Sequence, residues 1–195
     1  MRLLDRIFQR WRIAKARPYI FPGARVLDIG CGDGALFRCF DSIITEGWGI
    51  DPDLQRSLDR TRWKLIAGRF PRDLPEELAF DVITMLAVLE HIPPDKQSEF
   101  AVACARRLRA GGHLIITVPS PRVDRILWFL RGLRVIDARS LEEHYGFNPN
   151  DTPSLFSTAG LTLLVGKKFQ LGLNNLFVFK QAGRDSMPVP QQYGR

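Results

Sequence analysis

The sequence predicts an α/β fold with a single doubly wound, mostly parallel sheet of seven strands that ends in an antiparallel C-terminal hairpin. Two observations support this prediction. Apolar runs of strand length alternate with helical patterns along most of the 195 residues, which is the order that a parallel sheet requires. A turn with three glycines at alternate positions, Gly30–Gly34, follows the first of these strands. A chain of this length buries enough surface for one core without metal or disulfide support.

Strand composition occurs in seven segments of the sequence. In chain order the expected strands are 25–29, 48–51, 64–67, 80–86, 114–119, 161–169 and 176–180. The last two are close enough in sequence to pair as a hairpin, with Gly172 near the turn.

Helices are expected between these strands. One follows the glycines. Another starts at Pro52, where Leu54 and Leu58 would hold it to the sheet. A longer helix opens at Pro93, carries apolar residues at every fourth position, and is expected to end at Gly111.

The domain organisation follows from these elements. Residues 1–22 are expected to form a basic amphipathic helix, and residues 23–181 the sheet domain. An insertion at about 120–150 is expected to form a helical lid over the site for the second substrate. The last residues, 182–195, contain few apolar side chains and are expected to be disordered.

The glycine-rich turn indicates a ligand site. Gly30, Gly32 and Gly34 permit unusual backbone dihedrals and close approach, and their N–H groups are expected to face a nucleotide-like ligand. The run also satisfies the dinucleotide pattern G-x-G-x-x-G/A, which is a weak signal by itself. Asp28 before the first glycine and Asp33 inside the turn disfavour a diphosphate and favour a ligand with an amine and a sulfonium.

These residues resemble a known family. The run V-L-D-I-G-C-G-D-G at 26–34 is similar to the first motif of the class I S-adenosylmethionine-dependent methyltransferases. F-D-V-I at 80–83 and L-R-A-G-G-H-L at 108–114 resemble two later motifs, although Ala110 replaces a proline. The similarity is to small-molecule members, including ubiquinone-biosynthesis and lipid or glycoconjugate methyltransferases. It implies a Rossmann-like methyltransferase fold and S-adenosylmethionine as cofactor.

The resemblance also implies the residues that bind this cofactor. Asp51 ends an apolar strand about 20 residues after the glycines, where a carboxylate binds both ribose hydroxyls. The adenine is expected against Phe70 and Leu86, although Phe70 is equally well explained as a core aromatic. The methionyl part is expected on Asp28, Gly30, Cys31, Gly32 and Gly34, with Cys31 as a small residue of the loop rather than a nucleophile.

Two histidines are catalytic candidates. His91 follows the fourth strand in the pair Glu90-His91, where it is a candidate general base; the alternative is that the pair structures the turn into the next helix. His144 lies after the lid and is a candidate acceptor-site residue, or else a surface turn residue. Ubiquinone-biosynthesis relatives carry an E-x-x-E-H metal cluster, but its first position is Ala87 here, so no metal is expected.

Charge bears on the acceptor. The chain carries a net charge of +7, and basic amphipathic patterns occur at the N-terminus and at 122–139. They favour an acidic, phosphorylated or lipid-linked acceptor and peripheral contact with a membrane surface, although both apolar faces could equally pack on the sheet. Three cysteines, an odd number, indicate a reducing cytoplasm. No nucleic acid is expected, because no RNA-binding module is visible.

The predicted function is therefore S-adenosylmethionine-dependent methylation of a small molecule, with oxygen of a lipid, quinone or glycoconjugate as the acceptor. The first alternative is an inactive binding module with the same fold, acting as a partner subunit or binding RNA. The second is an NAD-dependent reductase.

Overall fold

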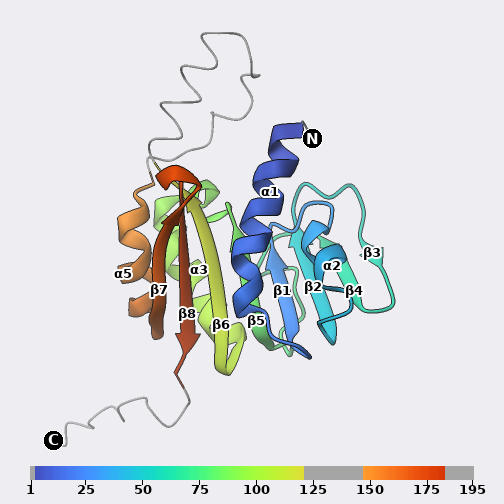
Figure 1. Cartoon of the computed structure of the whole chain (residues 1–195). Helices are drawn as coiled ribbons and strands as arrows, with labels where there is room; N and C mark the ends of the chain where they lie inside the picture. The colour runs from blue at the N-terminus through green and yellow to red at the C-terminus, as the bar shows by residue number, and fades with distance from the viewer. Residues whose placement is uncertain (1–2, 121–146, 183–195) are drawn as a thin grey trace, which may run out of the picture.

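The computed structural model describes residues 3–120 and 147–182, and side chains from Arg6 onward. One sheet of eight strands forms the centre of the molecule (Figure 1), in the order β3-β4-β2-β1-β5-β6-β8-β7. The strands are β1 (Arg25–Ile29), β2 (Glu46–Asp51), β3 (Leu58–Asp59), β4 (Trp63–Ala67), β5 (Phe80–Leu86), β6 (Leu108–Pro119), β7 (Leu161–Phe169) and β8 (Asn174–Gln181).

The sheet is mostly parallel, as predicted. Neighbouring strands from β4 to β6 run parallel, whereas β8 runs antiparallel to both β6 and β7 and so forms the predicted C-terminal hairpin. The predicted number of seven strands is one too few. The additional strand is β3, where Leu58 and Asp59 pair antiparallel with Leu65 and Lys64 at the edge of the sheet.

Helices cover both faces of the sheet (Figure 1). On one face, α1 (Leu3–Ala16) and α2 (Ala35–Phe40) contribute to a core with Val26, Val82 and Ile115. On the other, α3 (Pro94–Arg107) and α5 (Thr152–Thr158) contribute to a core with Leu27 and Ile83. Successive strand residues alternate between these two cores. The fold is doubly wound because helices cover both faces of the mostly parallel sheet.

Two predicted helix positions are wrong. No helix starts at Pro52; Asp51 Oδ1 accepts from the Asp53 backbone N–H at 2.9 Å, and the chain turns tightly toward β3. The helix that opens near Pro93 ends at Arg107 rather than at Gly111. Leu108 has extended dihedrals (φ −82°, ψ 137°) and begins β6, although its spacing from Cys104 suits a helix.

Arg107 connects α3 to the loop that precedes β5. Its guanidinium is buried and donates to backbone carbonyls of that loop, those of Leu74, Pro75, Glu76 and Leu78. Each bond has an ionised donor, so it is stronger than a neutral hydrogen bond. The loop therefore has a fixed position without forming a helix of its own.

In the part of the chain that the structure describes, no helix combines the length and apolar character that crossing a bilayer requires. The predicted lid and C-terminal tail lie almost entirely outside the described residues. Inside them, the insertion ends in a short 3₁₀ turn, η4 (Pro149–Asp151), directly before α5. The predicted domain boundaries stay predictions.

Candidate cofactor and active site

The glycine-rich loop connects β1 to α2 and contacts the end of β2. All three glycines have positive φ values, +73° at Gly30, +51° at Gly32 and +77° at Gly34. Their N–H groups donate inside the protein, to Ile50 O (2.8 Å), to Asp51 Oδ2 (2.8 Å) and to Cys31 O (3.0 Å). The expectation that these groups face a ligand is therefore wrong. A loop whose donors are already satisfied is poorly suited to bind a diphosphate.

The surroundings of the glycines differ. A Cβ atom added at Gly30 would lie 2.3 Å from Val88 Cγ2, so Val88 from the turn after β5 packs directly on this glycine. A Cβ atom added at Gly32 would have no heavy atom within 4 Å. Gly30 is therefore needed for packing, whereas the space over Gly32 is open to a ligand.

This difference gives two expected mutant phenotypes. Gly30→Ala should destabilise the fold, because both the positive φ and the clash with Val88 oppose the methyl group, and Val88→Ala should restore part of the loss. Gly32→Ala should keep the fold at a cost of about 1 kcal/mol and weaken cofactor binding. Thermal unfolding and calorimetric titration measure the two effects. Equal losses of stability in both variants would contradict this assignment.

Asp51 lies at the carboxyl end of β2, beside the loop. One carboxylate oxygen accepts from Gly32 N and the other from Asp53 N, at 2.8 and 2.9 Å. Each oxygen accepts more than one hydrogen bond, so the fixed carboxylate keeps capacity for two neighbouring hydroxyl groups. This geometry fits the predicted ribose contact.

Asp28 is buried below the loop. Its Oδ1 accepts from the Thr84 hydroxyl at 2.6 Å. Burial raises the pKa of Asp28 to about 7; the Thr84 hydrogen bond opposes this change, and the Asp51 charge adds to it. A ligand cation beside Asp28 would stabilise the ionised carboxylate and so oppose both effects that raise its pKa, burial and the Asp51 charge. This part of the site therefore favours a positively charged ligand group.

Asp33 contributes less to this preference than predicted. Its carboxylate pairs with Arg38 of α2 at 2.7 Å, and Arg38 also donates to the Asp33 carbonyl. Because Arg38 compensates this charge, the acidic character of the site comes from Asp28 and Asp51.

A cleft of about 750 Å³ opens next to the loop, a suitable size for a small ligand. It is lined by the ends of β1, β2 and β4, by the turn after β5 and by the start of α3. The cofactor candidates Gly30 and Phe70 and the catalytic candidate His91 all line it.

Phe70 packs edge-on against Phe100 of α3, with ring centroids 5.0 Å apart. It is therefore both a core aromatic and a wall of the cleft. Leu86, the other predicted adenine contact, lies on the opposite face of the sheet, against the core of Val26. Val88 and Ile92 are among the apolar residues that line the cleft together with Phe70.

Cys31 lies beneath the loop and is almost fully buried. Its side chain occupies the space that Gly49 of β2 leaves, because a Cβ atom there would lie 2.7 Å from Cys31 Sγ. Burial raises the pKa of the Cys31 thiol, and the charges of Asp28 and Asp51 raise it further. Cys31 supports the loop and is not an activated nucleophile.

His91 belongs to a 3₁₀ turn, η2 (Leu89–His91), between β5 and α3. It is exposed and lines the cleft, whereas the neighbouring Glu90 is buried. Ala87, just before this turn, has a φ of +61°, which is uncommon for a residue with a side chain. Such strain clusters at ligand sites.

His144 lies outside the described residues. Within residues 3–120 and 147–182, no cluster of three or more histidine, cysteine or acidic side chains has the arrangement of a metal site.

Sequence reasoning missed Thr84 and Val88. The strand period contained a signal for Thr84, because it pairs with Asp28 in the register of β1 and β5. No sequence signal pointed to Val88, whose contact depends on how the turn after β5 folds back on the loop.

Comparison with known proteins supports the fold and shows the family. A family model described as "Methyltransferase domain" matches residues 3–171. The chain belongs to this methyltransferase family, whose class I members use S-adenosylmethionine, so the predicted family and cofactor are confirmed.

Two relatives illustrate the similarity. A Mycolicibacterium smegmatis protein named "Probable S-adenosylmethionine-dependent methyltransferase" is 29% identical over 159 residues, which are 73% of this chain and 59% of the relative. The ubiquinone biosynthesis O-methyltransferase of Alkalilimnicola ehrlichii is 34% identical over 119 residues, which are 56% of this chain and 47% of the relative. The chain thus spans only about half of these relatives.

Solved structures share the fold. The Haloferax volcanii methyltransferase in complex with the Trm112 activator has a TM-score of 0.69 at 17% identity, covering 89% of this chain and 91% of that one. Burkholderia thailandensis 1,6-didemethyltoxoflavin-N1-methyltransferase, solved with S-adenosylhomocysteine, has a TM-score of 0.66 at 17% identity, covering 90% and 78%. Both confirm the predicted Rossmann-like methyltransferase fold.

Proposed function

We propose that this protein transfers a methyl group from S-adenosylmethionine to an oxygen atom of a small molecule, which is a lipid, a quinone or a glycoconjugate. The observation that carries the proposal is the buried acid below an open glycine loop. The raised pKa of Asp28 favours a ligand that brings a cation, and the space over Gly32 leaves room for it. A diphosphate would instead add negative charge beside Asp28 and Asp51.

The residues that would hold the donor fit its chemistry. Asp28 would face the methionyl amine, the open surface over Gly32 would contact the methionyl chain, and Asp51 would accept from the two ribose hydroxyls. Phe70 would contact the adenine, together with Val88 and Ile92 in place of Leu86. Bound S-adenosylmethionine supplies an electrophilic methyl group on a positively charged sulfur.

The chain's own contribution to the reaction is mainly alignment. A hydroxyl that attacks a methyl group loses its proton, and this proton needs an acceptor. His91 is exposed to the cleft, and an unperturbed imidazole titrates near neutral pH, so it suits the role of general base.

Oxygen as the acceptor atom is supported by the ubiquinone biosynthesis O-methyltransferases among the relatives, which are 26 to 34% identical to this chain. The net charge of +7 supports an acceptor with acidic or phosphorylated groups.

The experiment is a transfer assay with S-adenosylmethionine that carries a deuterated methyl group. The protein is incubated with membrane-lipid and cell-wall extracts, and mass spectrometry identifies products that gain the labelled methyl. We expect a labelled ether or ester in the lipid fraction. Labelled amines alone would contradict the assignment to oxygen. Donor binding without any labelled product would favour the inactive binding module.

His91→Gln should lower the rate of this transfer by about 100-fold, because a positioned base typically contributes that much. Its affinity for S-adenosylmethionine should change little. Ser98→Ala, a change at an exposed residue of α3 outside the cleft lining, is the control. A full rate in His91→Gln would show that His91 only structures the turn after β5.

A further inference from the structure

The first helix turns its largest described apolar side chains away from the protein. Trp11 is 52% exposed, Ile7 43% and Phe8 39%. The described apolar side chains of α1 that are buried are Ile13 and Ala16, and neither is aromatic. A surface helix normally does the opposite, because its apolar stripe faces the core.

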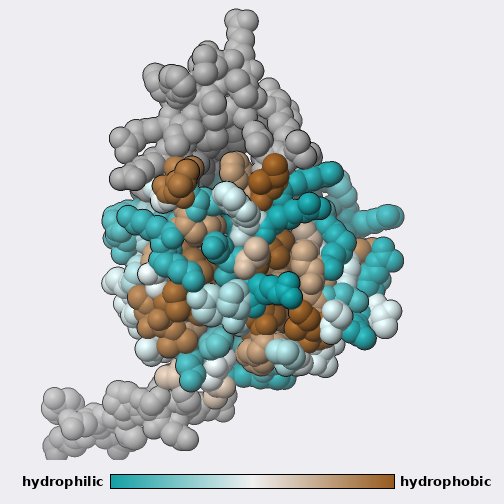
Figure 2. All heavy atoms as spheres, in the orientation of Figure 1, coloured by the Kyte–Doolittle hydropathy of each residue, from teal (hydrophilic) through white to brown (hydrophobic). Residues whose placement is uncertain are grey.

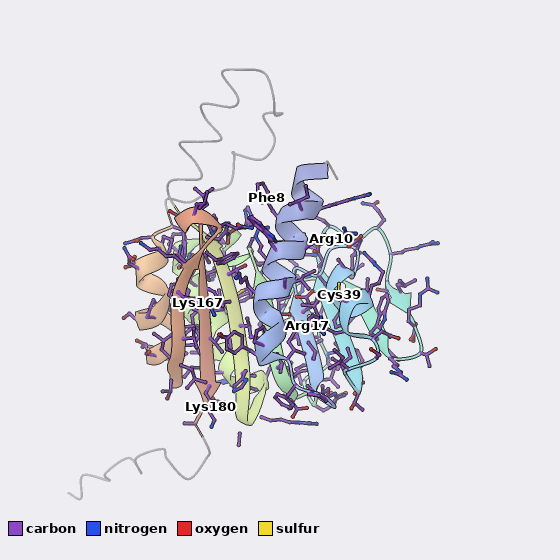
Figure 3. The ribbon with its side chains drawn as sticks, viewed as in Figure 1. Phe8, Arg10, Arg17, Cys39, Lys167 and Lys180 are labelled. Carbon is purple, nitrogen blue, oxygen red and sulfur yellow. The ribbon has the colours of Figure 1, made fainter. Side chains whose placement is uncertain are left out.

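The three exposed side chains form one patch. Trp11 is four residues after Ile7 and three after Phe8, and residues at these spacings are neighbours on a helix surface. Phe8 lies near the upper end of α1 in Figure 3. The ordinary packing that the sequence left open for this helix therefore does not hold for these residues.

Exposed cations accompany the patch. Arg6 and Arg10 lie on one side of it along α1, Lys15 lies one turn after Trp11, and Arg17 follows in the next turn. Figure 3 shows Arg10 and Arg17 extending from this part of the chain. A helix with an exposed apolar face and basic flanks suits the interface of an anionic lipid surface.

A further exposed apolar side chain, from another element, lies at the same edge of the molecule. Leu171, in the η5 turn (Gln170–Gly172) between β7 and β8, is 99% exposed. Gln170, Leu171 and Gly172 all have positive φ values, which is costly for the first two. Both the backbone strain and the exposed leucine cost stability, and strain of this kind clusters at functional sites.

The apolar patch of α1 and the η5 turn with Leu171 lie at the same edge of the sheet. Because β7 runs parallel to β1, its end at Phe169 and the η5 turn lie at the carboxyl edge of the sheet, where the glycine loop also lies. Figure 1 shows the N-terminal end of α1 and the η5 turn at this edge. Figure 2 shows hydrophobic spheres near both.

We propose that this edge docks on an anionic lipid surface through Ile7, Phe8, Trp11 and Leu171, with the nearby cations contacting the headgroups. A second copy of the chain fits less well, because it would place the arginines of α1 close to identical arginines. Docking of this kind would bring the cleft close to a lipid-linked acceptor. The docking itself does not depend on the proposed reaction.

The test is co-sedimentation of the full chain with vesicles, without cofactor or acceptor. We expect binding to vesicles with 30% phosphatidylglycerol and little binding to pure phosphatidylcholine. Salt should weaken binding, because it screens the cations. Since no methyl transfer is measured, failure of docking and failure of the proposed reaction are distinguishable.

Matched variants locate the contact. Trp11→Gln and Leu171→Gln should each lower the partition coefficient about tenfold, because each removes apolar surface from the lipid contact. Arg10→Gln should lower it about fivefold. The controls are Leu164→Gln, at a half-exposed leucine within β7, and Arg106→Gln on α3, and both should bind like the wild type.

Three outcomes would overturn the proposal. These are no binding to anionic vesicles, equal binding to both lipid compositions, and unchanged binding of both Trp11→Gln and Leu171→Gln. A concentration-dependent dimer by light scattering that Trp11→Gln abolishes would assign the patch to contact between two copies instead. Thermal unfolding of each variant checks that the fold is retained.

Discussion

Replacement of Asp51 by alanine should weaken binding of S-adenosylmethionine by at least about 100-fold. The variant would lack the two charge-assisted hydrogen bonds that the ribose hydroxyls donate to this carboxylate, each worth roughly 1.5–3 kcal/mol. The variant would also lack the hydrogen bonds that Gly32 N and Asp53 N donate to Asp51, which hold the loop against β2. Isothermal titration calorimetry measures the change in Kd.

Asp53→Ala is the matched control, because Asp53 contributes its backbone N–H and not its carboxylate to this arrangement. Its affinity should stay within about twofold of the wild type. Asp51→Asn, which keeps an acceptor for Gly32 N, separates loop order from ribose binding. An affinity of Asp51→Ala equal to that of Asp53→Ala would refute the ribose assignment.

Replacement of Asp28 by asparagine should stabilise the ligand-free protein and impair cofactor binding. Asparagine keeps an acceptor for the Thr84 hydroxyl and removes the charge that burial disfavours. A rise of the pKa from 3.8 to about 7 corresponds to roughly 4 kcal/mol at pH 8. Differential scanning calorimetry should therefore show a higher Tm for Asp28→Asn at this pH.

The sign of the pH dependence follows from linkage. Between pH 4 and 7 the unfolded chain has lost the Asp28 proton and the folded chain retains it, so this residue lowers stability as the pH rises, and the loss is complete above pH 7. Near pH 3, below both pKa values, the carboxyl is mostly protonated in both states, so Asp28→Asn and wild type should have similar stability. The gain from the substitution should grow toward neutral pH.

Binding should depend on pH in the opposite sense. If a ligand cation needs the ionised carboxylate, the affinity of the wild type should rise about fifteenfold from pH 5.5 to pH 7, because the ionised fraction rises by that factor. The α-amino group of a ligand stays protonated in this range. Asp28→Asn should bind weakly at both values.

Asp33→Asn is the control for Asp28→Asn, since it makes the same change five residues later, at an exposed residue that pairs with Arg38. It should alter stability by less than about 1 kcal/mol. A pH-independent affinity in the wild type would refute the role of Asp28 in cation binding.

Local sequence patterns predicted much of the fold. Strands at 25–29, 80–86 and 161–169 have the predicted bounds, because continuous runs of strand-forming residues mark them in the sequence. The prediction of a helix from Pro52 was wrong because the spacing of Leu54 and Leu58 is also compatible with a strand at Leu58. Leu58 of β3 pairs with Leu65 of β4, and this tertiary contact cannot be read from a local sequence pattern.

The site was predictable as a set of motifs but not as a set of contacts. Asp28, the glycines and Asp51 do meet at one edge of the sheet, as the order of parallel strands requires. The direction of each N–H group and the contact of Val88 with Gly30 depend on three-dimensional packing. Leu86 is different, because strict alternation along β5 would have placed it on the side of Val82 and away from Phe70.

The guanidinium of Arg107 has a consequence for molecular recognition. It ties the loop at Leu74–Leu78, which follows Phe70 and Pro71 in the chain, to the helix that follows His91. Two neighbouring parts of the cleft lining, the segment at Phe70 and the start of α3, thus belong to one connected unit in the folded chain. A molecule that enters meets a wall already in its binding geometry, and its affinity is not diminished by the entropy of ordering that wall.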